Sequence, residues 1–330
     1  MSKTPKTSIK DKKAVMEEAK STKSRNRENS KVAAPNRTKA KRKPQVETQD
    51  NVASNESNEV IAKELKSGPQ QKKVSKKQSD LLENLFNEAV DLHFGGRLEE
   101  AWSQYQEILK VAPLYFDAVH SMGLIAAQMN DLEMARKLFD QALVINPVNP
   151  QAHNNLANVL VKAGMVSEAL SHYDQAIDLE SGYAEALNNR GILLHSIKRP
   201  RDAIDSFSKA IAINSEFVEA IFNRGNALAQ LNEFIPAIQS YDKVIEIRPT
   251  YAAAYNNRGV ILRNIKQAEK ALINFDKAIA MDSTYAEAYS NRGYALLDLG
   301  RSSEALMSFD MALKLQPDYP SAIEGRKLIQ

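Results

Sequence analysis

Asparagine recurs at one constant interval along the second half of the sequence, at Asn155, Asn189, Asn223, Asn257 and Asn291. Asparagine is a poor residue for a helix interior, because its side chain competes for backbone hydrogen bonds. Its repetition therefore indicates another use. A carboxamide carries donors and an acceptor together, so it can pair with the N–H and the C=O of an extended peptide. The sequence predicts a wall of amides that binds the main chain of a partner with little sequence preference.

Further amides lie beside this row of asparagines and are candidates for contact with the same peptide. Three of them directly precede a row residue: Asn154, Asn188 and Asn256. Two others, Asn158 and Asn226, lie three residues after a row residue. Phe222 offers an apolar contact among them. A second interpretation stays open, in which asparagine at the row positions suits helix packing and an exposed groove without binding anything.

Arginine follows four of the five row asparagines, at Arg190, Arg224, Arg258 and Arg292. These side chains could attract acidic segments of a partner. We expect instead that their aliphatic stems pack between neighbouring structural units while the guanidinium groups reach solvent.

The other residue types that could carry catalysis or bind metals form no such pattern. None of His93, His120, His153, His172 and His195 lies three or four residues from another, and no HExxH string occurs. The chain has no cysteine, which excludes disulfides, thiolate nucleophiles and Cys-ligated metals. Neither a phosphate-binding glycine loop nor a GxSxG motif is present. We predict that the chain is not an enzyme and has no cofactor, metal site or small-molecule substrate.

The asparagine row belongs to a longer repeat of the same period, which begins at Leu82 and continues without insertion or deletion to Tyr319. The seven repeats are 82–115, 116–149, 150–183, 184–217, 218–251, 252–285 and 286–319. Positions within each repeat are numbered from 1 to 34. The row occupies position 6 of this frame, and its neighbours occupy positions 5 and 9.

Each repeat has the pattern of two short helices that pack closely. Position 8 is Gly or Ala, position 20 is Ala and position 24 is Tyr or Phe in all seven repeats. Helices that cross closely need small residues at the crossing point, and one aromatic ring then fills the remaining space. Proline at position 32 of four repeats ends the second helix. Pro200 and Pro236 fall in the first turn of a second helix, where a missing N–H is tolerated.

This pattern resembles the tetratricopeptide repeat (TPR), and the resemblance covers about three quarters of the chain. It implies an all-α fold, a right-handed α-solenoid (superhelix) of seven helix-turn-helix repeats whose first helices line a concave groove. One helix pair cannot bury its apolar face alone, so stability comes from stacking on its neighbours. The asparagine row is also similar to that of the TPR arm of O-linked N-acetylglucosamine transferases.

The two ends of the repeat array lead to different predictions. Asp80 and Glu83 have the spacing of a capping box, which predicts that the first helix opens there and that the ordered region is 79–319. Residues 320–330 begin an eighth repeat in register. They are interpreted either as a short capping helix or as the start of further repeats, and both readings stay open.

Residues 1–78 are predicted to be a disordered basic tail. Residues 1–80 carry 21 Lys and Arg, 10 Asp and Glu, and no aromatic residue, whereas residues 81–330 have a net charge of −8. A segment without large apolar side chains cannot offset the entropy of ordering, about 1–2 kcal/mol per residue. The basic clusters 39–43 and 72–77 could bind a weak anionic partner. A solvated tether is the favoured interpretation.

These observations favour a non-catalytic scaffold or adaptor that binds an extended peptide of a protein partner in the groove. The alternative is the substrate-binding TPR arm of a glycosyltransferase similar to O-linked N-acetylglucosamine transferase, with its catalytic domain on another chain or segment. No apolar run is long enough for a membrane span or a signal peptide, which predicts a cytoplasmic protein. Replacing Asn189, Asn223 and Asn257 by Ala is expected to abolish partner capture and leave unfolding nearly unchanged.

Overall fold

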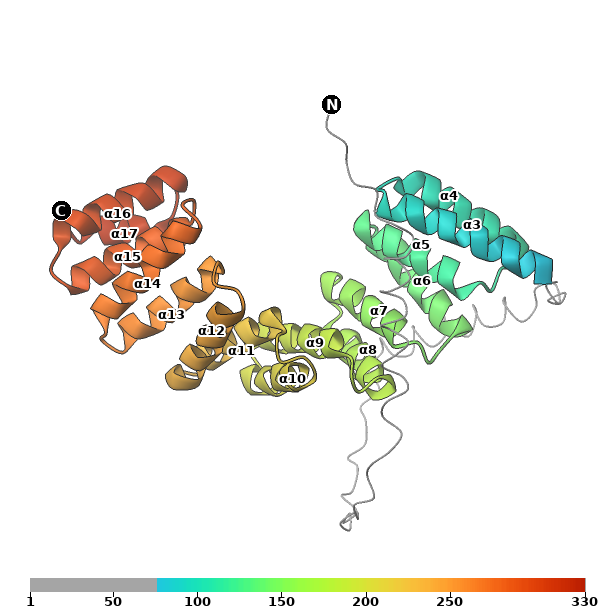
Figure 1. Cartoon of the computed structure of the whole chain (residues 1–330), viewed down its shortest axis with the longest axis horizontal. Coiled ribbons are helices and arrows are strands. Elements are labelled where there is room, and N and C mark those ends of the chain that lie inside the picture. Colours follow the sequence, from blue (N-terminus) through green and yellow to red (C-terminus); the bar gives the residue numbers. More distant parts are fainter. Residues whose placement is uncertain (1–75, 330) are drawn as a thin grey trace, which may run out of the picture. The chain divides into compact units, whose positions relative to one another are not determined.

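The computed structural model describes residues 76–329. These residues form fifteen helices and contain no strand (Figure 1). The all-α class and the succession of helix-turn-helix repeats are therefore confirmed for this part of the chain. The tail predicted over residues 1–78 lies outside the described residues up to residue 75.

Each repeat contains two helices, as the frame predicts. The first helices are α3 (Lys76–Phe94), α5 (Phe116–Gln128), α7 (Pro150–Lys162), α9 (Ala184–Ser196), α11 (Val218–Gln230), α13 (Ala252–Asn264) and α15 (Ala286–Asp298). The second helices are α4 (Leu98–Val111), α6 (Leu132–Ile145), α8 (Val166–Leu179), α10 (Pro200–Ile213), α12 (Phe234–Ile247), α14 (Ala268–Met281) and α16 (Ser302–Leu315). From α5 onward every first helix begins at frame position 1, and all seven second helices begin at position 17.

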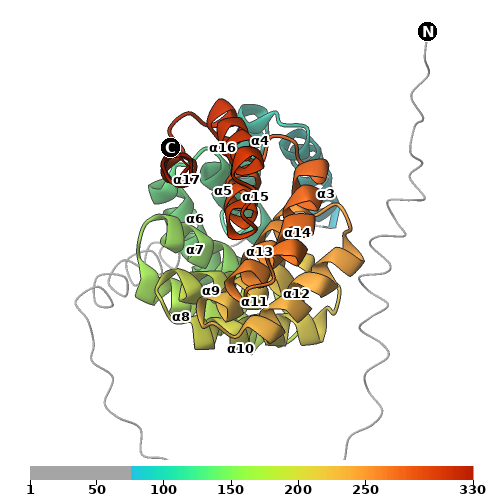
Figure 2. The same ribbon diagram turned by 90° about the vertical axis from the view of Figure 1, so that its left-hand side faces the viewer.

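The first helix begins earlier than predicted. Helix α3 starts at Lys76 and continues through Asp80, so the predicted capping box at Asp80 was wrong and residues 76–78 are helical. A side chain at Asp80 cannot cap a helix that has already completed its first turn. At the other end, residues 320–327 form α17 (Pro320–Lys327), which packs against α15 and α16 (Figure 2).

A left-handed residue at position 15 ends the first helix of every repeat. The φ angle there lies between 60° and 78° in all seven repeats. The N–H of the following residue then bonds back to the carbonyl of position 11, as Arg199 does to Leu194 at 2.9 Å. This is the bond of a Schellman motif, which satisfies a carbonyl that the helix leaves unpaired. The residues are Gly96, Asn130, Gly164, Lys198, Asn232, Lys266 and Gly300.

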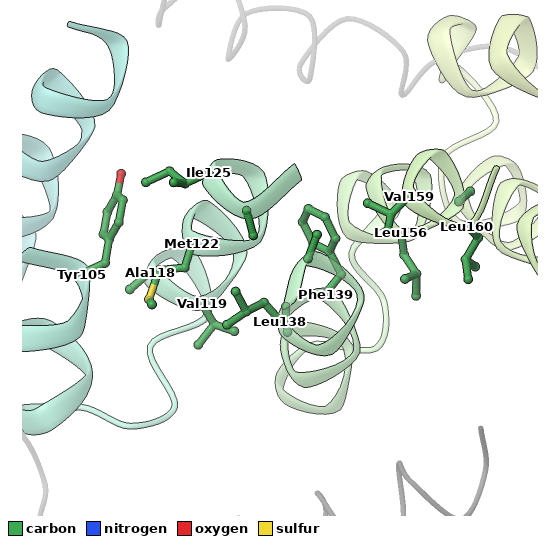
Figure 3. Packing of buried hydrophobic residues seen from close by; sticks show 14 of the residues in the cluster. Tyr105, Ala118, Val119, Met122, Ile125, Leu138, Phe139, Leu156, Val159 and Leu160 are labelled. Carbon is green, nitrogen blue, oxygen red and sulfur yellow. The ribbon is translucent and has the colours of Figure 1, made fainter. Parts of the chain in front are cut away.

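The small residue at position 8 and the aromatic ring at position 24 meet, as predicted, in the five repeats whose position 8 is glycine. A methyl group added to Gly123 would lie 2.8 Å from the ring of Phe139, and one added to Gly259 would lie 2.6 Å from Phe275. In Figure 3 the Phe139 ring lies between α5 and the Leu156 side of α7. Because no room remains for a Cβ, the glycine sets how closely the two helices of a repeat approach.

Neighbouring repeats pack through the first helix of the later repeat. Each second helix lies against the first helix of its own repeat and of the next one (Figure 1). First helices also contact one another directly from α5 to α17, and the second helices within residues 76–329 show no comparable contact with each other. The first helices therefore form a continuous layer, which carries the asparagine row. No helix among the described residues is long and apolar enough to cross a membrane.

Candidate functional site

The asparagine row (Asn155, Asn189, Asn223, Asn257 and Asn291) lies on consecutive first helices, α7, α9, α11, α13 and α15, with each side chain half-buried. The equal spacing in the sequence becomes a line in the structure because the first helices lie side by side. The row therefore forms a line along the first helices, and its contact with a partner stays a prediction.

The side-chain nitrogens of the row bind the preceding repeat. Four of the five Nδ2 atoms donate to the residue at position 5 of the repeat before, 35 residues earlier. These bonds join Asn155 to His120 Nε2 (3.1 Å), Asn189 to Asn154 Oδ1 (3.1 Å), Asn223 to Asn188 Oδ1 (3.2 Å) and Asn291 to Asn256 Oδ1 (2.9 Å). The row thus links successive first helices, and the packing interpretation of these asparagines holds for their nitrogens.

Asn257 finds a different acceptor because Phe222 occupies position 5 of the preceding repeat. Its Nδ2 donates instead to Asn226 Oδ1 at 2.9 Å, and that oxygen also accepts from the hydroxyl of Tyr241 at 2.8 Å. The apolar residue removes one acceptor, and an asparagine at position 9 replaces it. The link between repeats is therefore kept where its usual partner is missing.

The side-chain oxygens of the row are in a different situation. Within residues 76–329, no hydrogen bond engages Oδ1 of Asn189, Asn223 or Asn291. Oδ1 of Asn155 accepts a long bond of 3.5 Å from Asn154, and Oδ1 of Asn257 accepts one of 3.2 Å from Asn256. A carbonyl oxygen has two lone pairs, so each oxygen retains capacity to accept. We predicted that the carboxamides would both donate and accept, but the structure leaves mainly acceptors.

The neighbouring amides that the sequence proposed for peptide contact serve inside the protein. The position 5 residues Asn154, Asn188 and Asn256 are only 5%, 6% and 0% exposed. At position 9, Asn158 accepts from the hydroxyl of Tyr173 at 2.6 Å, and Asn226 has the two bonds described above. These residues lie beneath or beside the row and support it. We leave them out of the surface that a partner contacts.

The arginines at position 7 bind the preceding second helix and do not face a partner freely. Three of them pair with the Asp at position 25 of the preceding repeat: Arg190 with Asp174 (2.7 Å), Arg258 with Asp242, and Arg292 with Asp276 (2.7 Å). Arg224 is the exception, since position 25 of that preceding repeat is Ser208. Its guanidinium contacts Ser240 Oγ at 3.3 Å, and burial lowers its pKa.

Two histidines that the sequence left unconnected meet across repeat 3. Nδ1 of His153 on α7 lies 3.0 Å from Nδ1 of His172 on α8, and Nε2 of His153 lies 3.1 Å from the carbonyl of Pro147. Burial lowers the pKa of His172 to about 4, helped by His153 and Arg136. This contact could not be predicted from the spacing of the histidines, because it links two different helices. Among the described residues no group of three or more His, Asp or Glu could hold a metal.

Position 34 carries a second row, of aromatic residues, which was not predicted to be part of the site. Six of the seven repeats have Tyr or Phe there, each half-buried: Tyr115, Tyr183, Phe217, Tyr251, Tyr285 and Tyr319. We call these residues the aromatic row. The Tyr251 ring lies 5.1 Å from the ring of Phe222 at position 5. Burial raises the pKa of Tyr285 to about 12, and a hydrogen bond with Asn256 opposes the rise. Four of the six rings, those of Tyr115, Tyr183, Tyr251 and Tyr285, thus lie beside position 5 of their repeat.

Known families match much of this array. Models described as "TPR repeat" match residues 123–164 and 225–266, and models described as "Tetratricopeptide repeat" match 148–216, 252–285 and 286–319. Together these matches cover more than half of the chain. No protein of curated function matches the sequence significantly.

Several solved structures share the fold at low sequence identity. The C-terminal part of a TPR repeat-containing protein from Cytophaga hutchinsonii is 17% identical, with a TM-score of 0.61 over 73% of this chain and 98% of that one. PilF of Pseudomonas aeruginosa is 20% identical, with a TM-score of 0.57 over 64% and 97%. A TPR protein from Parabacteroides merdae is also 20% identical, with a TM-score of 0.56 over 75% and 98%. Similarity at this level establishes the arrangement of helices alone.

Proposed function

Because the chain belongs to the tetratricopeptide repeat family, whose fold is a scaffold for protein interactions, we propose that it binds an extended segment of a partner protein along the asparagine row. TPR proteins are generally scaffolds without catalytic activity. The partner of this chain is therefore a protein or a peptide, and the cytoplasm is its proposed location.

The observation that carries the proposal is the unequal use of the two ends of each carboxamide. The nitrogens hold the row in place between repeats, while the oxygens of Asn189, Asn223 and Asn291 have no partner in residues 76–329. Main-chain N–H groups are the donors that every peptide offers except at proline. A line of fixed acceptors therefore suits a partner backbone, and it requires little of the partner's side chains.

Fixed acceptors are favourable for binding because their orientation needs no further ordering. Each row asparagine is already held by its Nδ2 bond, so little side-chain entropy is lost when a partner binds. A net hydrogen bond contributes about 0.5–1.5 kcal/mol, and several in a line suffice for an affinity that mutation can measure. The resemblance to the arm of O-linked N-acetylglucosamine transferases stays a prediction from the sequence, as does a weak anionic partner for the basic tail.

The inter-repeat bonds of the row determine which variants can test this function. Replacing row asparagines by Ala removes these bonds as well as the acceptors, so the sequence-based expectation of unchanged unfolding does not hold. A matched control loses the same three bonds but keeps the row oxygens. The row variant carries Asn189→Ala, Asn223→Ala and Asn291→Ala, and the control variant carries Asn154→Ala, Asn188→Ala and Asn256→Ala.

Capture from a lysate of the source organism, followed by mass spectrometry, compares the two variants with the unmodified chain. We expect both variants to unfold at lower denaturant concentration. The row variant should lose partners that the control variant retains. If the two variants capture the same proteins to the same extent, the row oxygens do not bind the partner and the proposal is wrong.

A further inference from the structure

The spacing of the asparagine row restricts which backbone can use it, and this inference rests on the function proposed above. Neighbouring first helices are in direct contact, and bonds of 2.9–3.2 Å join position 6 of one to position 5 of the other. Packed helices have axes about 8–10 Å apart. From this range we estimate an interval of about 9 Å between successive row oxygens along the layer of first helices.

Two extended conformations can be tested against this interval. A β-strand rises about 3.3 Å per residue and presents the same side every second residue, which gives about 6.6 Å. Polyproline II has three residues per turn and rises about 3.1 Å per residue, so the same side recurs at about 9.3 Å. Only polyproline II places a main-chain N–H opposite every row oxygen.

The aromatic row gives an independent reason for the same conformation. Rings of the aromatic row lie beside position 5, as shown by Tyr115 against Phe86 (5.7 Å) and by Tyr251 against Phe222 (5.1 Å). The rings are only half-buried, so part of each is open to a ligand. Grooves that bind polyproline II are lined by aromatic side chains, because the rings pack on pyrrolidine faces. Repeats 3–7 thus each have one row asparagine and one ring of the aromatic row.

We infer that the asparagine and aromatic rows recognise a proline-rich segment in the polyproline II conformation that carries a non-proline residue at every third position. The N–H of that residue donates to a row oxygen, and the two intervening positions tolerate proline and pack on the aromatic row. Polyproline II makes no internal hydrogen bonds, so these N–H groups are free to be donated. The partner is thus defined by a period of three and not by particular side chains.

Defined peptides test the period directly on the full chain. The first probe is a fluorescein-labelled peptide of six Pro-Pro-Ala triplets, measured by fluorescence anisotropy. The second is polyproline of equal length, which keeps the conformation but has no N–H. The third has the composition of the first with the alanines placed irregularly. We expect saturable binding of the first probe and at least tenfold weaker binding of the other two.

Variants connect the binding to the two rows. The row variant and a Tyr183→Leu, Tyr285→Leu double variant should each weaken binding of the first probe at least fivefold. The control variant keeps the row oxygens but frees their orientation, so it should weaken binding less than the row variant does. Urea unfolding of each protein establishes that it is folded under the assay conditions. Equal binding of polyproline and Pro-Pro-Ala peptides overturns the N–H period, and an unaffected tyrosine variant overturns the role of the aromatic row.

Selection from a random peptide library separates this inference from the proposed function. Enrichment of peptides with proline at two of every three positions supports both. Peptides that depend on the row oxygens but lack this period overturn the inference and leave the proposed function standing. If no peptide is enriched by the unmodified chain over the row variant, both are wrong.

Discussion

Repeats 2 and 3 (116–183) and repeats 4–7 (184–319) share one apolar frame but hold their polar groups together in different ways. In repeats 4–7, position 7 is Arg and in three of the four it pairs with Asp on the preceding second helix. In repeats 2 and 3, position 7 is Met122 or Leu156. There Arg136 reaches Glu168 at 2.9 Å, and the His153–His172 contact lies beside it.

The two regions share the contact between positions 8 and 24 but differ in their polar bonds. Position 8 and position 24 meet in both regions, with Gly123 against Phe139 in one and Gly259 against Phe275 in the other. The polar bonds vary around this contact, and histidine side chains take part in them in repeats 2 and 3. We conclude that packing defines the repeat, while the polar bonds give each region its response to pH and salt.

The largest expected effect tests the shared frame. Phe139→Ala in repeat 2 and Phe275→Ala in repeat 6 each remove a fully buried ring, and each should lower the free energy of unfolding by about 3–5 kcal/mol. Urea denaturation followed by circular dichroism measures the loss. A large loss for only one of the two variants would show that the regions do not share one frame.

Acid should distinguish the two regions. Burial lowers the pKa of His120 and of His172 to about 4, so the folded state binds fewer protons than the unfolded state, whose histidines titrate near 6.5. Stability from these groups is present above pH 6.5 and is lost as pH falls toward 4. Burial raises the pKa of Asp140 to about 6, and its contribution has the opposite sign over a similar range. We expect a net loss of about 3 kcal/mol between pH 7 and pH 4.5.

Hydrogen exchange measured by mass spectrometry at pH values between 7 and 4.5, corrected for the intrinsic exchange rate, localises this loss. Protection should fall in α5–α8 and persist in α13–α16, where the described residues include no histidine. His172→Gln should reduce the pH dependence by well over half, because Asp140 then offsets most of the remaining contribution of His120. Uniform loss of protection in both regions would contradict the assignment to these histidines.

The turns offer a smaller effect that sharpens the comparison. At position 15, repeat 3 has Gly164 with φ 78°, whereas repeats 4 and 6 have Lys198 and Lys266 with φ 62°. A left-handed residue other than glycine costs about 1–2 kcal/mol, and glycine also adds entropy to the unfolded chain. Lys198→Gly and Lys266→Gly should therefore each stabilise by about 0.5–1 kcal/mol in thermal unfolding. The control Gly164→Lys should destabilise by a similar amount.

The smallest effect concerns the one position 7 arginine without a carboxylate partner among the described residues. Ser208→Asp would give Arg224 the partner that Arg190, Arg258 and Arg292 have, and should stabilise by about 0.5 kcal/mol, less at high salt. The reverse change, Asp276→Ser, should remove a similar amount from repeat 7. Paired measurements at low and high NaCl identify the ionic part. If the gain in stability does not depend on salt, it comes from helix propensity and not from the ion pair.

Much of this fold follows from periodicity. The frame beginning at Leu82 predicts the start of every second helix and of every first helix from α5 onward, because Gly, Ala and aromatic residues mark the helix crossing in each repeat. The start of α3 was predicted at Asp80 and was wrong, because the helix begins at Lys76. Pro200 and Pro236 fall in the first turns of α10 and α12, as expected.

The sequence predicts that the row asparagines lie on one line, but it does not predict their hydrogen-bond partners. The spacing places Asn189 and its equivalents on one line, yet it does not say that Nδ2 reaches back 35 residues while Oδ1 stays open. That choice depends on the distance between helices, which a single repeat does not encode. The His153–His172 contact was hidden for the same reason. The aromatic row, in contrast, was visible once per repeat from Tyr115 to Tyr319, with one interruption at Asn149.

The backward bond of the asparagine row has a consequence for how such a chain can grow. A typical repeat brings a donor for the unit before it and an acceptor for the unit after it, as Asn189 and Asn188 do. A gene duplication of one such unit would therefore insert a module whose bonds on both sides are already specified. Repeat 5 is different, because Phe222 offers no acceptor and Asn226 must accompany it. Tandem copies of that unit would carry both Phe222 and the asparagine that replaces its acceptor. Row asparagines can therefore be added in whole repeats without new bonds at the junctions.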